Sequence, residues 1–263
     1  MKIARFSYAG KTKYGVVDNQ IIKGYRGNPF ANPATGKVYF AADGTRYKLG
    51  EVKLLAPCEP SKIVCLGLNY RKHIEETGSK FPESPILFLK PPSALLNPDE
   101  YIIRPKSAKG RVDYEGEVGV VIGKKAKEVP ENKALDYILG YTCVNDVTDR
   151  FAQQKDGQWT RAKGFDTFCP IGPWIETEGN RDRIEVKTLL NGQIRQNSDT
   201  SYLIFKIPYL ITFISEVMTL MPGDVIATGT PEGIGPMNSG DTIEIKVEGV
   251  GTLRNYVRDQ AAG

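Results

Sequence analysis

Short strand-like runs dominate the pattern of apolar and polar positions along the chain. In these runs apolar residues either alternate with polar ones or fill about four to eight consecutive positions, and both patterns are typical of β-strands. The runs cover residues 2–8, 13–17, 20–25, 62–67, 86–90, 115–123, 138–146, 172–177, 185–192, 224–229 and 241–257. Many strands with few helices predict an α+β fold that is mostly β.

Helical patterns are rarer and fall in two segments. Residues 69–78 form a polar segment that Gly78 is suited to end. Residues 208–220 place apolar side chains mostly at helical spacing, and Pro208 suits the first turn of a helix. A shorter polar segment, residues 147–154, is also compatible with a helix.

The chain changes character near residue 57. The first three strand-like runs are separated by short turn-like segments, and a stretch rich in Gly, Pro and Asn follows at residues 27–36. Pro57 and Pro60 then mark a plausible boundary. We therefore expect a small β-rich N-terminal domain, residues 1–57, and a larger domain, residues 58–263.

Length and composition describe an ordinary globular protein. The chain has 263 residues, of which 40% are hydrophobic and 25% charged, and 35 Lys and Arg stand against 31 Asp and Glu. So small an excess, without a run of like charges, argues against a nucleic-acid partner. No segment approaches the ~18 apolar residues that cross a bilayer, and none of the four cysteines forms a C-x-x-C pair. We expect a cytoplasmic protein with reduced, buried thiols and no membrane partner.

The segment VDYEGEVGV, residues 112–120, contains an unusual row of acids. Alternate residues of a strand share a face, so Asp113, Glu115 and Glu117 would project together, with neighbours about 7 Å apart. A solvated strand face would explain this spacing. The following run, VGVVIG, instead indicates a covered strand, in which like charges need a cation or hydrogen bonds. A divalent metal would supply that compensation.

Asp146 offers a further carboxylate, because it ends the apolar run 138–146. Since a polar segment follows, it could equally be the N-cap of a helix. Together with Glu115 and Glu117 it would form an all-oxygen site, which suits Mg²⁺, Mn²⁺ or Ca²⁺ and not zinc. Three protein ligands would leave positions open for water or a chelating substrate, as a catalytic metal requires.

Three other features allow both a structural and a functional interpretation. His73, the only histidine, would share a helix face with Glu76, either as an exposed salt bridge or as a general base oriented by a carboxylate. Lys163 lies among aromatic and apolar residues, although most lysines are surface residues. The segment MPGDVIATGTPEGIG could be a plain turn or a backbone amide cradle for a carboxylate.

Six motifs in this order resemble those of the fumarylacetoacetate hydrolase family, from about residue 60 to 257. They are GLNYRKHIEE, DYEGEVGVVIGK, GYTCVNDVTDR, QWTRAKGFDTFCPIGPW, LLNGQIRQ and LMPGDVIATGTPEGIG. The first 57 residues resemble, less closely, the small N-terminal domain of many bacterial members. The family commonly continues Asn-Asp-Val-Thr with Ala-Arg-Asp-x-Gln, from which Asp149 and Phe151 depart. We expect this departure to affect the shape of the pocket.

The resemblance implies a catalytic domain folded as a mixed β-sandwich roll, usually in a homodimer. It implies Mg²⁺ or Mn²⁺ on Glu115, Glu117 and Asp146. It also implies a His73 and Glu76 dyad on a lid-like segment, with Lys163 as the active-site lysine. The residues that it implies as pocket lining are Lys90, Arg150, Gln153 and Thr230.

The expected activity is hydrolysis of a carbon-carbon bond in an acylpyruvate-type 2,4-dioxo acid. The metal would chelate the carboxylate and the 2-oxo oxygen, His73 would deprotonate a water, and Lys163 would stabilise oxyanion charge. Decarboxylation or isomerisation of 2-oxo dicarboxylates, such as oxaloacetate or 2-hydroxyhepta-2,4-diene-1,7-dioate, would need no activated water. An inactive metal-binding scaffold is the alternative of a different class.

Overall fold

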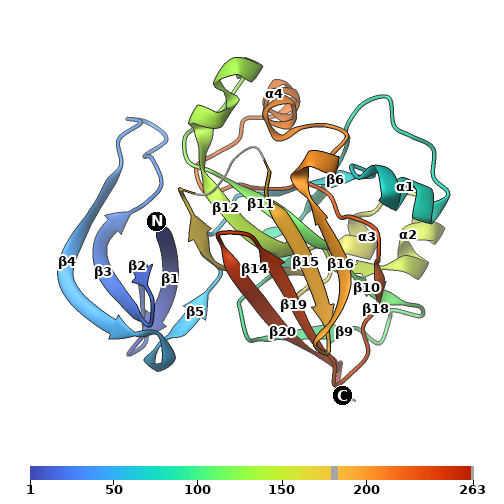
Figure 1. Ribbon diagram of the computed structural model, residues 1–263, viewed down its shortest axis with the longest axis horizontal. Coiled ribbons are helices and arrows are strands. Elements are labelled where there is room, and N and C mark those ends of the chain that lie inside the picture. Colours follow the sequence, from blue (N-terminus) through green and yellow to red (C-terminus); the bar gives the residue numbers. More distant parts are fainter. Residues whose placement is uncertain (179–182, 262–263) are drawn as a thin grey trace.

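The computed structural model describes residues 1–178 and 183–261. Within these residues strands predominate, and they form one sheet of 12 strands, one of five and one of three (Figure 1). The predicted fold class, α+β and mostly β, is confirmed. The described part of the chain contains no helix long and apolar enough to cross a membrane.

One end of the large sheet is made by the N-terminal part of the chain. Its strands are β1 (Lys2–Tyr8), β2 (Lys11–Asp18), β3 (Ile21–Asn28), β4 (Tyr39–Lys48) and β5 (Lys53–Leu55). β1 pairs with β2, β5 and also β14, so these strands and the later ones share one sheet. The division of the chain into two domains near residue 57 stays a prediction.

The remainder of the large sheet forms the centre of the molecule. Its strands are β6 (Ile63–Gly67), β7 (Ile86–Lys90), β8 (Leu95–Leu96), β11 (Gly116–Ile122), β12 (Ile138–Asn145), β14 (Cys169–Glu176) and β17 (Val225–Ala227). Every residue of β11 is buried. This central strand is therefore covered on both faces, as the run VGVVIG indicated.

A second sheet packs on the large one and completes a sandwich. It consists of β9 (Tyr101–Arg104), β15 (Glu185–Leu190), β16 (Gln193–Asp199), β19 (Thr242–Val247) and β20 (Gly251–Asp259). Strands β11, β12 and β14 contact β15, β19 and β20. Apolar residues from both sheets, among them Val118, Val120, Ile243 and Ile245, belong to the largest buried cluster. Parallel pairs such as β6 with β17 make the sandwich mixed.

Short helices and the smallest sheet complete the fold. They are α1 (Arg71–Thr77), α2 (Arg150–Asp156), α3 (Thr160–Lys163), α4 (Ile207–Val217), β10 (Val112–Tyr114), β13 (Thr148–Asp149) and β18 (Gly235–Pro236), with 3-10 turns at Leu49–Glu51, Pro92–Ala94, Glu131–Tyr137 and Thr200–Tyr202. α1, α2 and α3 gather on the side of the molecule away from β1–β4 (Figure 1). The two predicted helices correspond to α1 and α4.

Several strands differ from the sequence-based expectation, among them β4, β16 and the pair of β19 and β20. β4 has no fully buried residue, and the buried residues of β16 are Gln196 and Asp199, so neither strand shows an apolar period. Residues 241–257 form the hairpin of β19 and β20 rather than one strand, because the chain turns at Gly249, where φ is 75°.

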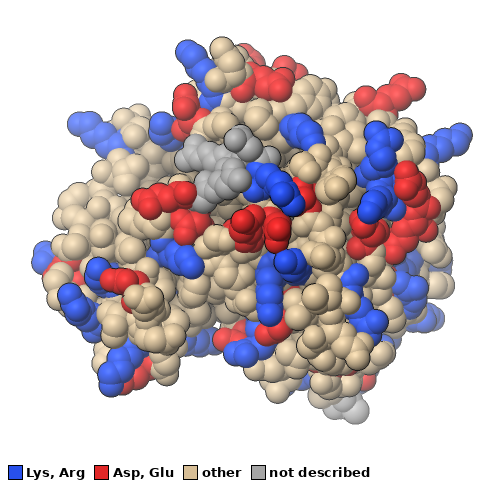
Figure 2. Space-filling view, in the orientation of Figure 1, with Lys and Arg blue, Asp and Glu red and all other residues tan. Residues whose placement is uncertain are grey.

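The surface charges are mixed, and the cysteines are buried, as the composition led us to expect. The face shown in Figure 2 carries Lys and Arg interspersed with Asp and Glu, in keeping with the net charge of +4. All four cysteines are buried and free.

Candidate active site

Three carboxylates from two adjacent strands converge at one end of the large sheet. Glu115 lies between β10 and β11, Glu117 lies on β11, and Asp146 directly follows β12. Because β11 and β12 are antiparallel, the start of one meets the end of the other. The three side chains are almost fully buried, and one oxygen of each lies within 4.8 Å of the others. We call them the carboxylate cluster.

Two buried ammonium groups contact this cluster. Lys163 Nζ donates to Glu115 Oε2 at 2.8 Å and to Asp146 Oδ2 at 2.6 Å. Lys90 Nζ donates to the other Asp146 oxygen at 2.6 Å and to the carbonyl of Val147 at 3.0 Å. Burial alone would lower the pKa of Lys163, but Asp146 and Glu115 outweigh it and raise that pKa above its ordinary value. Lys163 is thus a buried cation that two carboxylates hold in place, not a surface lysine.

Glu117 is the member of the cluster whose charge is not offset. Among the described residues it has no ion pair, and it accepts one hydrogen bond, from the Gly229 N–H at 2.8 Å. Burial, and then the neighbouring Asp146 and Glu115 carboxylates, raise the pKa of Glu117 well above its ordinary value. Burial also opposes the charge of Glu115, but Lys163 and Arg150 lower its pKa. Three buried carboxylates with one lacking a cation fit a hard divalent ion, which prefers oxygen ligands.

Glu117→Gln is expected to raise the melting temperature of the metal-free protein by roughly 2–4 °C at alkaline pH, because the raised pKa of Glu117 means that ionising this buried carboxyl costs stability as the pH rises, whereas the amide stays neutral. The same substitution should abolish the rise in melting temperature that Mn²⁺ gives the unsubstituted protein. Scanning calorimetry in EDTA and in Mn²⁺ measures both effects. Glu178→Gln, at an exposed carboxylate, is the control. A variant that still responded fully to Mn²⁺ would show that Glu117 is no ligand.

The carboxylate cluster opens into a pocket of about 470 Å³. Leu66, Phe88, Trp159 and Ile234 make its apolar wall. Its polar lining includes His73, Arg111, Glu115, Glu117, Arg150, Gln153, Gln154, Lys163 and Thr230. Lys90 does not line the pocket, because it lies behind Asp146, and its predicted role in substrate binding stays a prediction. Such a pocket has room for a small acid beside a metal ion.

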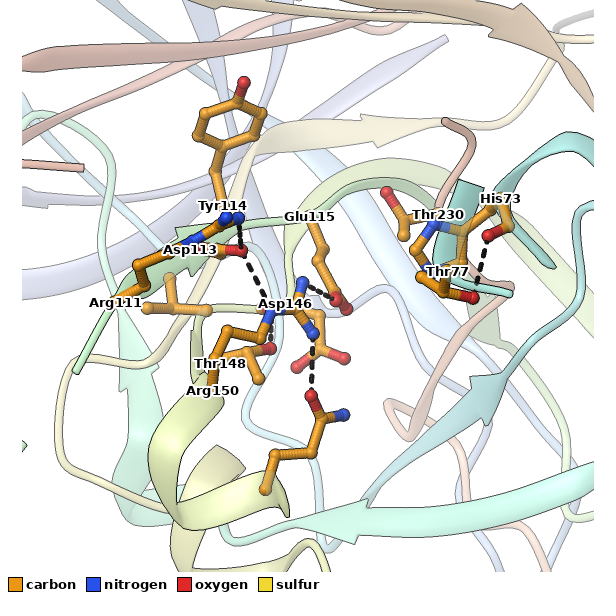
Figure 3. A network of polar contacts seen from close by, with 12 residues as sticks. His73, Thr77, Arg111, Asp113, Tyr114, Glu115, Asp146, Thr148, Arg150 and Thr230 are labelled. Atoms are coloured by element: carbon orange, nitrogen blue, oxygen red, sulfur yellow. Dashed lines mark hydrogen bonds and ion pairs between the residues drawn. The ribbon is translucent and has the colours of Figure 1, made fainter. Parts of the chain in front are cut away.

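His73 faces this pocket from α1 and is held by a carboxylate. The histidine is 7% exposed, so it is not part of an exposed salt bridge. Its Nδ1 lies 3.2 Å from Glu76 Oε2, and the other Glu76 oxygen accepts the Gly233 N–H at 3.0 Å. When Nδ1–H donates to Glu76, Nε2 carries the lone pair and can accept a proton. Figure 3 shows His73 and Thr230 on one side of Glu115, with Arg111 on the other.

Arg150 connects the carboxylate cluster to a fourth buried acid. From the first turn of α2 its guanidinium donates to Glu115 Oε1 at 2.5 Å, to Asp113 Oδ2 at 2.9 Å and to Gln153 Oε1 at 2.9 Å. The N-cap of α2 is Asp149, which accepts two backbone N–H groups, so the N-cap interpretation of Asp146 is wrong. Asp149 and Phe151 do not line the pocket. The effect of this departure on the shape of the pocket stays a prediction.

The glycine-rich segment between β17 and β18 binds carboxylates of the protein itself. Its Gly229 and Gly233 amides hold Glu117 and Glu76. Gly229 has a φ of 101°, and a Cβ there would lie 2.8 Å from the Cβ of Asn69. Only glycine suits this position. The predicted amide cradle thus positions one acid of the carboxylate cluster and the partner of His73.

Two further residues, Gln196 and Arg111, shape this site although the sequence patterns did not indicate them. Gln196 Oε1 accepts the Gly116 N–H at 2.9 Å, while its Nε2 donates to Thr230 Oγ1 and to the carbonyl of Pro231, each at 2.8 Å. It thereby ties the second sheet to the carboxylate cluster. Arg111, which lines the pocket, stands two residues before Asp113. Arg111 continues the series of alternate residues that contains Asp113, Glu115 and Glu117, so this spacing could have indicated it.

The chain matches two protein-family models. Fumarylacetoacetate (FAA) hydrolase C-terminal matches residues 62–258, and Rv2993c-like, N-terminal matches residues 1–57. An uncharacterised protein of Methanocaldococcus jannaschii is 50% identical over 215 residues, which are 82% of this chain and 90% of that protein. An oxaloacetate tautomerase of Bacillus subtilis is 41% identical over 225 residues, with shares of 80% and 75%.

Solved structures share this fold over nearly the full length of both chains. The 5-carboxymethyl-2-hydroxymuconate delta-isomerase of Mycobacterium smegmatis has a TM-score of 0.90 and 44% identity, covering 99% of this chain and 100% of that one. The maleylpyruvate hydrolase of Sphingobium sp. SYK-6, solved with manganese(II) and pyruvate, has a TM-score of 0.80 and 31% identity, with the same coverage. The sandwich with its N-terminal strands is therefore a recurring architecture.

Proposed function

Since the chain belongs to the fumarylacetoacetate hydrolase family, we propose that it is a metal-dependent enzyme on small 2-oxo acids, hydrolysing a carbon-carbon bond of an acylpyruvate-type 2,4-dioxo acid. The observation that carries this proposal is the carboxylate cluster at a pocket that also contains a histidine held by Glu76. A structural metal would need neither the histidine nor the pocket.

Glu115, Glu117 and Asp146 would hold Mg²⁺ or Mn²⁺, and Ca²⁺ fits the same ligand chemistry. When bound, the ion would chelate the carboxylate and 2-oxo oxygen of the substrate and stabilise negative charge that develops there. Glu117 supports this assignment, because among the described residues its buried carboxyl has no ion pair. The manganese and pyruvate found with the maleylpyruvate hydrolase support it as well.

His73 would be the general base of hydrolysis. Its Nε2 takes a proton from a water molecule as the water oxygen adds to the carbonyl remote from the 2-oxo group. The carbon-carbon bond then breaks, its electrons pass to the pyruvate fragment as an enolate, and protonation of that enolate gives pyruvate. Glu76, itself fixed by the Gly233 N–H, keeps the imidazole oriented throughout.

Lys163 would act as a fixed positive charge. Its ammonium bridges Glu115 and Asp146, and it lies 4.8 Å from the centroid of the Phe88 ring, so its position is closely defined. From there it would stabilise the oxyanion charge of the reacting acid. Arg150, Gln153 and Thr230 would orient the substrate.

Enolisation without hydrolysis is the second candidate function. The relative from Bacillus subtilis is named an oxaloacetate tautomerase, and the solved structure from Mycobacterium smegmatis is named an isomerase. Isomerisation, tautomerisation or decarboxylation of a 2-oxo dicarboxylate would use the carboxylate cluster and Lys163, but no water activated by His73.

Turnover of a small panel of 2-oxo acids, with and without a chelator, tests the proposal. Release of pyruvate from an acylpyruvate that stops on chelation and resumes with Mg²⁺ or Mn²⁺ would support hydrolysis. Metal-dependent tautomerisation or decarboxylation of oxaloacetate without acylpyruvate cleavage would favour the second function. An inert protein whose melting temperature alone responds to metal would be a scaffold. Light scattering would test the expected homodimer.

A further inference from the structure

Arg111 is a cation of the pocket that takes no part in the proposed reaction. It precedes β10, where Nε donates to Asp113 Oδ1 at 3.1 Å and Nη2 donates to Asp113 Oδ2 at 2.6 Å. Asp113 is fully buried and also accepts the bond from Arg150, so two guanidinium groups share one carboxylate. This two-point contact fixes the plane of the Arg111 guanidinium.

The opposite edge of that guanidinium is free to bind something else. Nη1 of Arg111 has no hydrogen-bond partner within residues 1–178 and 183–261, although Arg150 has a partner on each nitrogen. The Arg111 side chain is 56% exposed and lines the pocket. A cation held in orientation by one edge, with donors left on the other, is suited to receive an anion.

Arg111 also lies at the outer part of the pocket relative to the carboxylate cluster. Glu115 contacts Arg150, Arg150 contacts Asp113, and Asp113 contacts Arg111, so Arg111 is connected to the cluster through two intervening residues. The side chain of Arg111 is 56% exposed, against 15% for Arg150 and 6% for Glu115, while Asp113 between the two arginines is fully buried. Figure 3 shows Arg111 approaching Asp113 from the side away from His73.

We propose that Arg111 forms a subsite for a second carboxylate, at the end of the substrate remote from its 2-oxo group. The substrates are then 2-oxo dicarboxylates, because a monocarboxylate of the same length leaves the free donors of Arg111 facing water. This inference rests on the proposed function, since the 2-oxo end must bind at the carboxylate cluster for the other end to reach Arg111. A purely structural Arg111, needed only to neutralise Asp113, is the competing explanation.

Calorimetric binding of matched acids, in the presence of Mg²⁺, tests the subsite without requiring turnover. The probes are 2-oxoglutarate against 2-oxopentanoate, and 2-oxoadipate against 2-oxohexanoate, which differ pairwise only in the second carboxylate. We expect at least one diacid to bind about 10-fold more tightly than its monoacid partner, the scale of one charge-assisted hydrogen bond. Arg111→Gln should bring this ratio close to one and leave monoacid binding within a few-fold.

Two further variants separate the subsite from general damage. Arg111→Lys keeps the charge and should retain part of the preference for the diacid. Arg254→Gln is the matched control, because Arg254 is similarly exposed and also pairs with an aspartate through Nε, yet it does not line the pocket. It should leave the ratio unchanged.

The outcomes separate a failure of the Arg111 subsite from a failure of the proposed function. If no diacid is preferred, or if the preference survives in Arg111→Gln, the subsite is refuted while the 2-oxo acid site stands. If neither monoacids nor diacids bind in a metal-dependent way, the proposed function fails, and the subsite fails with it.

Discussion

His73→Gln is expected to lower acylpyruvate cleavage by about 10²- to 10⁴-fold, the usual contribution of a positioned general base. Glutamine keeps a polar side chain of similar reach but cannot take the proton of water. Oxaloacetate decarboxylation should change only a few-fold, because loss of CO₂ gives the enolate without an activated water and without removal of a proton from carbon. Both activities are measured on one metal-loaded sample. The bound metal is quantified, so that an activity lost through loss of metal is not attributed to loss of the general base.

Glu75→Gln, an exposed substitution on the same helix, provides the control for α1 and should affect neither activity. If acylpyruvate cleavage survives intact in His73→Gln, the role given to His73 is wrong. If both activities fall equally with metal still bound, the shared requirement is closure of the segment around α1 over the pocket rather than proton transfer.

Lys163→Met is expected to destabilise the metal-free protein by about 3–5 kcal/mol, as found when one partner of a buried ion pair is removed. The reason is that Glu115 and Asp146 share the Lys163 ammonium, so its loss leaves three buried carboxylates with contacts only to Arg150, at Glu115, and Lys90, at Asp146. Mn²⁺ should restore part of this stability, since a divalent ion offsets the same charges. Hydrolysis and enolisation should both fall, because Lys163 serves either reaction.

Urea unfolding in EDTA and in Mn²⁺ measures this effect, with Lys48→Met as the control. Lys48 is 72% exposed and pairs with an exposed glutamate, so its loss should cost less than about 1 kcal/mol. A metal-free Lys163→Met protein as stable as the unsubstituted one would contradict the electrostatic account of the cluster.

Local alternation was sufficient to group the acids of the site. Glu117 lies on the covered strand β11, Glu115 lies directly before this strand, and Asp146 directly follows the neighbouring strand β12. These features depend on strand geometry and burial, and both can be inferred from the order of apolar and polar residues in a short segment. The pairing of His73 with Glu76 is equally local, since both lie on one helical turn.

Contacts between distant segments could not be derived in this way. Gln196 reaches Gly116 and Thr230 from the second sheet, and its strand has no apolar period because its buried residues are polar. Lys90 contacts Asp146 from β7 and does not line the pocket, although Phe88 on the same strand does. Arg111 stands near the acids in the sequence, but its free edge depends on how Arg150 reaches Asp113 from α2.

The most direct measurement of the central claim is the anomalous scattering of a crystal soaked with Mn²⁺ and oxalate, a stand-in for the pyruvate enolate. We predict one strong peak at the pocket floor, within coordination distance of Glu115, Glu117 and Asp146, with oxalate filling two of the remaining positions. Manganese bound elsewhere, or a cluster in which these three carboxylates leave the ion uncoordinated, would contradict the account.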